Sequence, residues 1–168
     1  LVQLKQPLQK NKTYVIDFNN SIEDLNEGNT LGGLKYVFST GETIDSAVIS
    51  GEVVDFEYNE PVQNGLVGLY QGDVTGFFDS IISQKKPDFI TLTNKEGKYD
   101  YSNLKSGLYT LFCIKDENLN LKYEPSEMVS MPTILNLKDS LVSNMSIFLS
   151  NTKNTALQDG TKNIDLTK

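Results

Sequence analysis

The ten residues GLYTLFCIKD, numbered 107–116, decide the fold. Side chains of different character alternate along this stretch, and a period of two is typical of a half-buried β-strand. One face would carry Leu108, Thr110, Phe112 and Ile114, and the other would carry Tyr109, Leu111 and Cys113. The same period recurs in TYVIDFN (13–19) and KYVFST (35–40), and turn residues such as Asn64-Gly65 and Ser106-Gly107 separate the segments.

Alternation and turn residues predict further short strands on both sides of this stretch. They are expected over 2–6, 13–19, 34–40, 46–55, 65–71, 88–93, 97–102, 107–115 and 143–149, with another short extended piece near 132–137. Short strands separated by regular turns are typical of an all-β sandwich or barrel. The expected sandwich core comprises Val48, Val53, Val67, Leu69, Ile90, Leu92, Tyr99, Tyr109, Leu111, Cys113, Ile147 and Leu149.

The segment GFFDSIISQKK, residues 76–86, departs from this pattern. Its four large apolar residues fit helical spacing, and Pro87 would end a helix there. We expect a short helix or a wide loop between two strands, and an irregular hairpin is the alternative.

The composition divides the chain into three parts. Residues 151–168 contain four apolar residues and no aromatic residue, so we expect a disordered polar tail or linker. Residues 46–150 contain enough strands to close a sandwich alone. Residues 1–45 contribute only a few extra N-terminal strands, which are marginal without a cover and are therefore expected to pack on the sandwich or on strands from upstream.

Charge and composition exclude several classes of function. The chain has 15 Lys and no Arg against 22 Asp and Glu, so its net charge of −7 argues against nucleic acid as a partner. It has no His, which removes Ser-His-Asp and Cys-His nucleophiles and His-ligated zinc. We therefore expect that the protein is not an enzyme. No apolar run is long enough to span a membrane.

The lone cysteine and the first residue give two further expectations. Cys113 lies inside an apolar strand and is expected to be a small buried side chain, since a single thiol cannot form an internal disulfide. The chain begins with Leu1 and shows no signal peptide, so we expect a fragment or a processed chain.

Two motifs carry a resemblance to a known family. The segment SAVISGEVVDFEYNEPVQNGLVGLY (46–70) resembles the opening of carboxypeptidase-regulatory-like, or transthyretin-like, sandwich domains. Thr93–Tyr99 matches the T-(D/N)-x-x-G-x-(F/Y) turn of that family, and Leu104–Tyr109 matches its L-x-x-G-x-Y turn. The resemblance implies a transthyretin-like sandwich over 46–150.

The upstream segment TYVIDFNNSIEDLNEGNTLGGLKYVFSTGETIDS (13–46) resembles the end of a bacterial Ig-like domain. The resemblance implies that 1–45 is the C-terminal part of such a domain, in a combination found in cell-envelope proteins of the Bacteroides–Flavobacterium group. It implies a non-catalytic structural or interaction module with envelope or surface protein partners. The implied location is extracytoplasmic, in the periplasm or at the cell surface, with an outer-membrane lipoprotein as one form of the whole protein. The alternative is a module that binds a glycan or a peptide.

One loop has the spacing of a calcium site. Counted from Asp116 as position 1, KDENLNLKYEPSE (115–127) places oxygen ligands at positions 1, 3, 5, 7 and 12, as an EF-hand loop does. The expected ligands are the side chains of Asp116, Asn118, Asn120 and Glu127 and the carbonyl of Lys122. Leu121 stands where the sharp turn prefers Gly, so a polar β-loop without metal is the competing interpretation.

The remaining candidates have simpler structural explanations. Tyr58, Tyr70, Tyr99, Tyr101 and Tyr123 could stack on sugar rings, although tyrosines at period two more often pack in a core. The carboxylates Glu23, Asp24, Glu27, Glu57 and Glu60 are expected to be solvated rather than to form an acid–base pair. Three Asp-Ser-apolar tripeptides, at 45–47, 79–81 and 139–141, resemble O-glycosylation acceptors of the same bacterial group.

Overall fold

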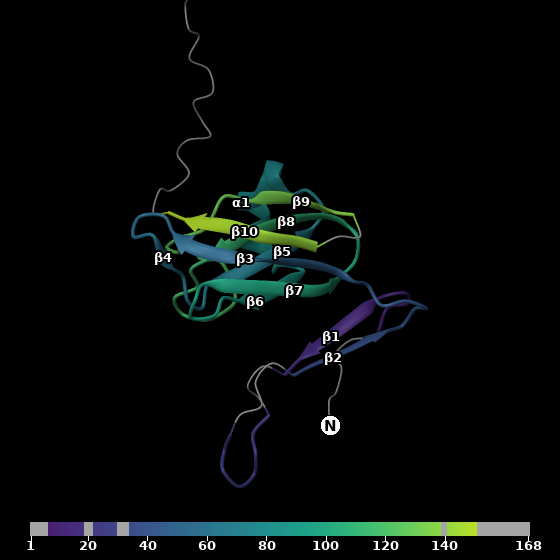
Figure 1. Ribbon diagram of the computed structural model, residues 1–168. Coiled ribbons are helices and arrows are strands. Elements are labelled where there is room, and N and C mark those ends of the chain that lie inside the picture. Colours follow the sequence, from purple (N-terminus) through teal and green to yellow (C-terminus); the bar gives the residue numbers. More distant parts are fainter. Residues whose placement is uncertain (1–6, 19–21, 30–33, 139–140, 151–168) are drawn as a thin grey trace, which may run out of the picture.

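The computed structural model describes residues 7–18, 22–29, 34–138 and 141–150 (Figure 1). The elements are β1 (Thr13–Asp17), β2 (Lys35–Ser39), β3 (Ala47–Asp55), β4 (Glu60–Pro61), β5 (Leu66–Gln71), a 3-10 turn (Thr75–Phe77), α1 (Phe78–Gln84), β6 (Phe89–Leu92), β7 (Lys98–Leu104), β8 (Gly107–Ile114), β9 (Thr133–Leu137) and β10 (Leu141–Leu149). The expected strand 2–6, the glycosylation candidate Ser140 and the expected tail 151–168 lie outside the described residues. No helix in the described ranges is long and apolar enough to cross a membrane.

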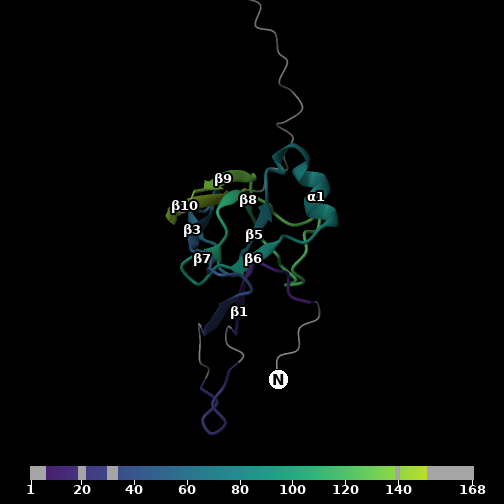
Figure 2. The same cartoon turned by 90° about the vertical axis from the view of Figure 1, so that its right-hand side faces the viewer.

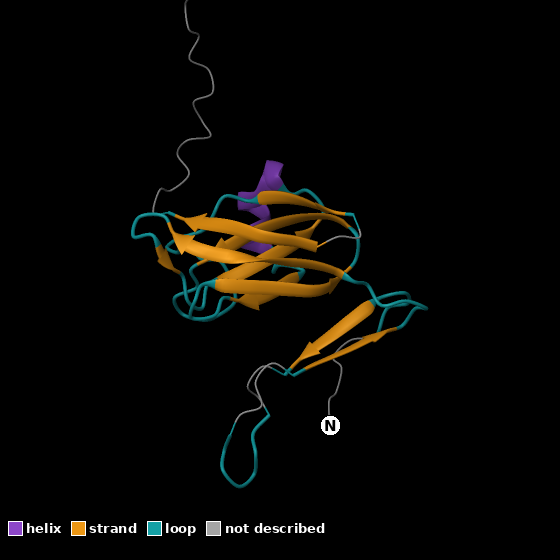
Figure 3. Ribbon diagram, in the orientation of Figure 1, coloured by secondary structure: helices purple, strands orange, loops and turns teal. Residues whose placement is uncertain are grey.

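The main body is an all-β sandwich (Figure 3). In one sheet β10 pairs in parallel with β3, and β4 and β7 pair with β3 in antiparallel fashion. The other sheet has the order β6-β5-β8-β9 and is antiparallel throughout. The expected strands from 13 onward are confirmed to within two residues at each end, and the short strand β4 was not expected.

The first core lies between the two sheets. It contains Ala47, Ile49, Val53, Val62, Val67, Leu69, Tyr99, Tyr101, Leu104, Tyr109, Leu111, Cys113, Leu135, Leu137, Ile147 and Leu149. Two tyrosine hydroxyls of β7 bond to carbonyls of other strands: Tyr101 donates to the Val67 carbonyl of the facing sheet at 2.6 Å, and Tyr99 donates past Gly51 to the Met145 carbonyl of its own sheet at 3.2 Å. Cys113 is fully buried, as expected.

A second core lies on the opposite face of β5 and β8, where α1 covers the sheet (Figure 2). Phe112 is stacked on Tyr70 at 5.3 Å between ring centroids and meets Phe78 of α1 edge-on at 5.0 Å. Gly68 makes room for this ring, because a Cβ there would lie 2.5 Å from the Phe112 ring. The helical spacing in 76–86 therefore predicts α1 correctly, but β8 is buried on both faces rather than one.

Three expected core residues are placed differently by the structure. Val48 is only partly buried, because residues 48 and 53 point to opposite faces of a regular strand and Val53 points inward. Leu92 is 44% exposed and Ile90 is partly buried on the α1 side. Both belong to β6, an outer strand that pairs only with β5 among the described strands.

β1 and β2 form a separate two-stranded antiparallel ribbon beside the sandwich (Figure 1). Polar contacts at both ends of the ribbon join it to the sandwich: the Asp45 N–H donates to Thr13 Oγ1 at 2.8 Å, and at the other end Lys35 Nζ lies 3.4 Å from Asp100 Oδ2. No described side chain of the ribbon is fully buried.

Candidate functional site

The candidate calcium loop projects from the end of β8 and is closed at its neck. The Lys115 N–H donates to the Met128 carbonyl at 2.9 Å, and Ile114 and Val129 form an isolated antiparallel bridge. Beyond this bridge, the Ser130 N–H donates to the Cys113 carbonyl at 2.9 Å. The sequence between 116 and 127 is therefore held as a loop by the strands on either side of it.

Asp116 organises the first half of the loop. Its carboxylate is buried and accepts the N–H of Asn120 at 3.2 Å and the N–H of Leu121 at 2.7 Å. The side-chain oxygen of Asn118 also accepts the Asn120 N–H, at 3.0 Å, and that of Asn120 accepts the Lys122 N–H at 2.8 Å. Three predicted ligand side chains thus point their oxygen atoms into the turn.

Two residues of this turn have left-handed backbone conformations. Leu119 has φ of 56° and Leu121 has φ of 59°, in a region that non-glycine residues visit at a cost of about 1–3 kcal/mol. The turn that position 6 requires is therefore formed without Gly. The hydrogen bonds to Asp116 offset the strain, because they are made only in this conformation.

The Glu124 carboxylate joins the second half of the loop to the first. Asn118 Nδ2 donates to Glu124 Oε2 at 3.1 Å, and Asn120 Nδ2 donates to Glu124 Oε1 at 3.0 Å. The sequence interpretation did not include Glu124 among the ligands. Its place at position 9, where EF-hand loops often bind calcium through water, is the signal that could have identified it.

Glu127 carries the least satisfied polar atom of the loop. Its Oε2 accepts the Glu124 N–H at 2.9 Å, whereas its buried Oε1 has no hydrogen-bond partner among the described residues. Burial raises the pKa of the Glu127 carboxyl, and the hydrogen bond from Glu124 opposes that rise only in part. A carboxylate oxygen without a donor is an acceptor that a cation could use.

The loop as it stands is held by hydrogen bonds rather than arranged around one point. In the ranges that the structure describes, no three Asp, Glu, His or Cys side chains are grouped closely enough to hold a metal ion. Asp116, Asn118 and Asn120 are joined by hydrogen bonds through the turn, and Glu127 accepts a hydrogen bond from the Glu124 N–H. A metal would therefore require the Glu124 and Glu127 side chains to move toward Asp116.

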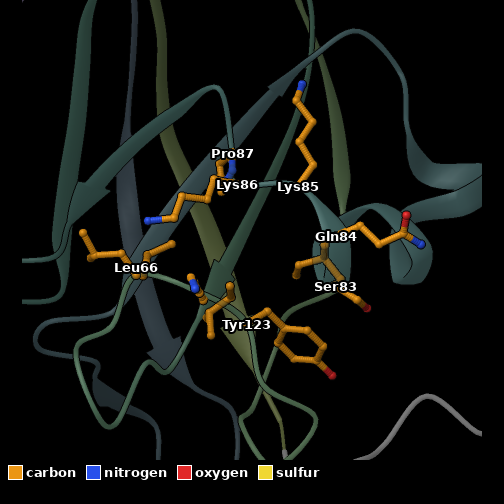
Figure 4. A pocket seen from close by; sticks show the side chains of 11 residues that line it. Leu66, Ser83, Gln84, Lys85, Lys86, Pro87 and Tyr123 are labelled. Carbon is orange, nitrogen blue, oxygen red and sulfur yellow. The ribbon is translucent and has the colours of Figure 1, made fainter. Parts of the chain in front are cut away.

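The loop also forms one wall of a small pocket against the end of α1. The pocket has a volume of about 180 Å³, and Figure 4 shows Leu66 and Lys86 on one side of it and Ser83 and Gln84 on the other. It is lined by Leu66, Ile82, Ser83, Gln84, Lys85, Lys86, Pro87, Ile114, Leu121, Lys122 and Tyr123. Its floor is apolar and three lysines surround it, and Lys85 is already paired with Asp88 at 2.8 Å.

The tyrosines considered for sugar stacking do not form one exposed face. Tyr70, Tyr99 and Tyr101 are buried in the two cores, Tyr123 is partly buried and Tyr58 is 67% exposed. Burial raises the pKa of the Cys113 thiol well above its usual value, so it is not a reactive thiolate. The acceptor serines Ser46 and Ser80 of two glycosylation candidates are both exposed.

Comparison with known proteins adds little to this geometry. No protein-family model matches the chain, and no curated protein sequence matches it. Among solved structures, (S)-allantoin synthase is similar over 66% of this chain and 43% of its own, at 13% identity and a TM-score of 0.40. A putative carbohydrate binding protein from Pseudomonas aeruginosa is similar over 65% of this chain and 90% of its own, at 12% identity and a TM-score of 0.38.

A Streptococcal ancillary pilin is similar over 84% of this chain and 46% of its own, at 11% identity and a TM-score of 0.40. The chain thus spans less than half of two of these three proteins. Similarities at this level carry no argument about activity, ligand or family.

Proposed function

We propose that this chain is a non-catalytic interaction module of a bacterial cell-envelope or surface protein. The observation that carries the proposal is the uncovered face of the β1–β2 ribbon. The extracytoplasmic setting is supported only by the family resemblance and by the exposure of the acceptor serines Ser46 and Ser80.

The ribbon has an aromatic face. The register places Tyr14 opposite Phe38 and Ile16 opposite Tyr36, so these four side chains share one face. The rings of Tyr14 and Phe38 are stacked at 5.5 Å, and Tyr36 lies 5.8 Å from Phe38. Such a group of side chains normally forms part of a core.

Nothing in the described chain covers this face completely. Tyr36 is 60% exposed, and Tyr14, Ile16 and Phe38 are each only partly buried. Among the described strands, β1 and β2 pair only with each other. A two-stranded sheet is marginal in water by itself, so the ribbon gains stability from a sheet that covers it. We infer that a neighbouring β-domain of an envelope protein provides that sheet.

Hydrogen exchange tests this proposal. In the isolated chain, the amides of Ile16 and Tyr36, which bond across the β1–β2 pair, should exchange orders of magnitude faster than those of Val67 and Leu111 in the sandwich. In a longer protein that contains the neighbouring domain, the amides of Ile16 and Tyr36 should become protected. If Ile16 and Tyr36 are as protected in the isolated chain as Val67 and Leu111, the ribbon needs no partner and the proposal fails.

We also propose calcium as the ligand of the 116–127 loop. The supporting observations are the preformed turn on Asp116 and the unpartnered Oε1 of Glu127. Asp116, Asn118, Asn120 and Glu127 would bind through side chains and Lys122 through its carbonyl, with Glu124 as an added ligand. The ligands are all oxygen atoms, which suits Ca²⁺ rather than zinc or copper. A thermal melt with and without calcium, in wild type and in Glu127→Gln, tests the assignment.

The glycan alternative finds less support than the interaction module. Three of the five tyrosines that would have formed a stacking face are core residues. The exposed Tyr58 lies in the turn between β3 and β4, near the exposed Phe56.

A further inference from the structure

The outer edge of β10 differs from the other outer edges of the sandwich. β10 pairs only with β3 among the described strands, so its opposite edge is open (Figure 1). The Leu149 carbonyl accepts the Phe56 N–H at 2.8 Å, which turns Leu149 toward β3. Because successive residues of a strand present their backbone groups to opposite sides, the N–H and carbonyl groups of Ser146 and Phe148 face the open edge.

This edge lacks the features that usually protect an exposed strand. Protected edges are short, or they carry charged residues or Pro. β6 and β9 have only four and five residues, and β7 carries Lys98 and Asp100. β10 has nine residues, none of them charged and none of them Pro. Its only irregularity is a register shift between Val142 and Met145, so the half from Met145 to Leu149 pairs regularly with β3.

A groove runs beside this half of the strand. Its volume is about 340 Å³, and it is lined by Phe56, Val129, Ser130, Met131, Thr133, Ser146, Ile147, Phe148 and Ser150. The rim is apolar and exposed: Phe56 is 70% exposed, Met131 62% and Phe148 53%. The rings of Phe56 and Phe148 meet edge-on at 6.3 Å and form an aromatic platform. The groove therefore offers backbone hydrogen-bonding groups and side-chain contacts along one line.

The charges near the groove favour one kind of occupant. The turn that carries Phe56 also carries Asp55, Glu57 and Glu60, and neither this turn nor the groove lining contains a Lys. A second copy of the chain would bring a net charge of −7 to the same place, which opposes association. A strand with basic residues would be attracted.

We propose that the open edge of β10 binds an extended peptide segment of a partner protein by strand addition. The segment has apolar residues at alternate positions and Lys or Arg near one end. Its backbone pairs with Ser146 and Phe148. Its side chains on one face lie against Phe148 and Phe56, and those on the other lie against Met131. This surface is separate from the β1–β2 ribbon and from the calcium loop, so it does not depend on either proposal.

Selection from a displayed library of random nonapeptides tests the inference, with the whole chain as bait. The enriched peptides should alternate apolar residues and carry an excess of Lys or Arg. In each such peptide, N-methylation of every second amide should abolish binding, and N-methylation of the intervening amides should not. This period-two pattern is specific to backbone pairing along a strand.

Variants of the chain provide the matched controls. Phe148→Lys should weaken peptide binding roughly tenfold or more, because it places a charge of the wrong sign on the platform. Leu108→Lys changes a side chain of similar exposure on β8, 44%, and should leave binding unchanged. Ser146→Pro removes an outward N–H and should weaken binding, whereas Ser146→Ala should not. Melting temperatures verify that each variant is folded.

Three results would overturn the inference. The selection could return no peptides beyond those recovered on Phe148→Lys. The selected peptides could bind with no period-two response to N-methylation. Light scattering could show a wild-type dimer that Phe148→Lys converts to a monomer, which would assign the edge to a second copy of the chain.

Discussion

The β5–β8 pair and the β1–β2 ribbon are built from similar types of residue but differ in how far their side chains are buried. Both are antiparallel pairs that contain apolar and aromatic residues. β5 and β8 are buried on both faces, by the β3 sheet on one side and by α1 on the other, whereas no described side chain of the ribbon is fully buried. Local pattern therefore determines which segments become strands, and the number of covering layers determines how much each strand contributes to stability.

The largest expected effect is in the doubly covered pair. Phe112→Ala removes a fully buried ring that contacts Tyr70 and Phe78, and should lower the free energy of unfolding by about 3–5 kcal/mol. Urea unfolding followed by circular dichroism measures this loss. A loss below about 1 kcal/mol would mean that α1 does not form a tightly packed layer on β8.

Gly68→Ala should have the next largest effect. The added methyl group would lie 2.5 Å from the Phe112 ring, so the ring must leave its position between Tyr70 and Phe78. Overpacking of this kind costs about 1–3 kcal/mol. In the double variant Gly68→Ala/Phe112→Ala, the methyl group no longer meets a ring, so the cost of Gly68→Ala should largely disappear. Full additivity of the two costs would contradict the contact.

Calcium should stabilise the sandwich by a smaller amount. For a dissociation constant of about 10⁻⁴–10⁻³ M, 10 mM calcium gives about 1.4–2.7 kcal/mol by mass action. The rise in melting temperature should be reversed by a chelator and absent in Glu127→Gln. Glu117→Gln removes the same charge from an exposed side chain and is the control. An unchanged melting temperature in wild type would leave 116–127 as a polar loop only.

The pH dependence of Glu127 adds an independent measurement without calcium. Since burial raises its pKa, the folded chain binds this proton more tightly than the unfolded chain. The contribution of Glu127 to stability is then present below the ordinary pKa of Glu and is lost as pH rises through the raised pKa. In chelator, Glu127→Gln should therefore be at least as stable as wild type at neutral pH. A clear loss of stability in that variant would show that the carboxylate is satisfied as it stands.

Sequence periodicity identified most of the fold because alternation and turn residues are local signals. It also included a short helix among the structures expected for 76–86. It did not show that Phe112 and Ile114 would pack under that helix, because the packing partner of a face is not encoded in the strand itself. Leu92 was predicted to be a core residue but is 44% exposed. The sequence does not show that β6 is an outer strand, and an outer strand has fewer neighbours to cover its side chains. In the loop, ligand spacing pointed to Asp116, Asn118 and Asn120 as candidate ligands, a prediction that stays open, and it did not show the hydrogen bonds from both asparagines to Glu124.

The smallest expected effect on the stability of the sandwich is that of Phe38→Ser in the ribbon. Its size shows most directly whether the ribbon and the sandwich unfold separately. Phe38→Ser removes a ring that is stacked on Tyr14 but is only partly buried. Because the ribbon joins the sandwich mainly through polar contacts at its two ends, the free energy of unfolding of the sandwich should change by less than about 0.5 kcal/mol. Exchange of the Ile16 and Tyr36 amides, which bond across the pair, should nevertheless become faster, since the aromatic stack stabilises the pairing of β1 and β2. Val37→Thr changes the opposite face of the same strand and should leave the aromatic stack in place.

If Phe38→Ser destabilises the sandwich by as much as Gly68→Ala, the ribbon and the sandwich unfold as one unit. The ribbon is then a structural layer of the sandwich rather than a surface for a partner.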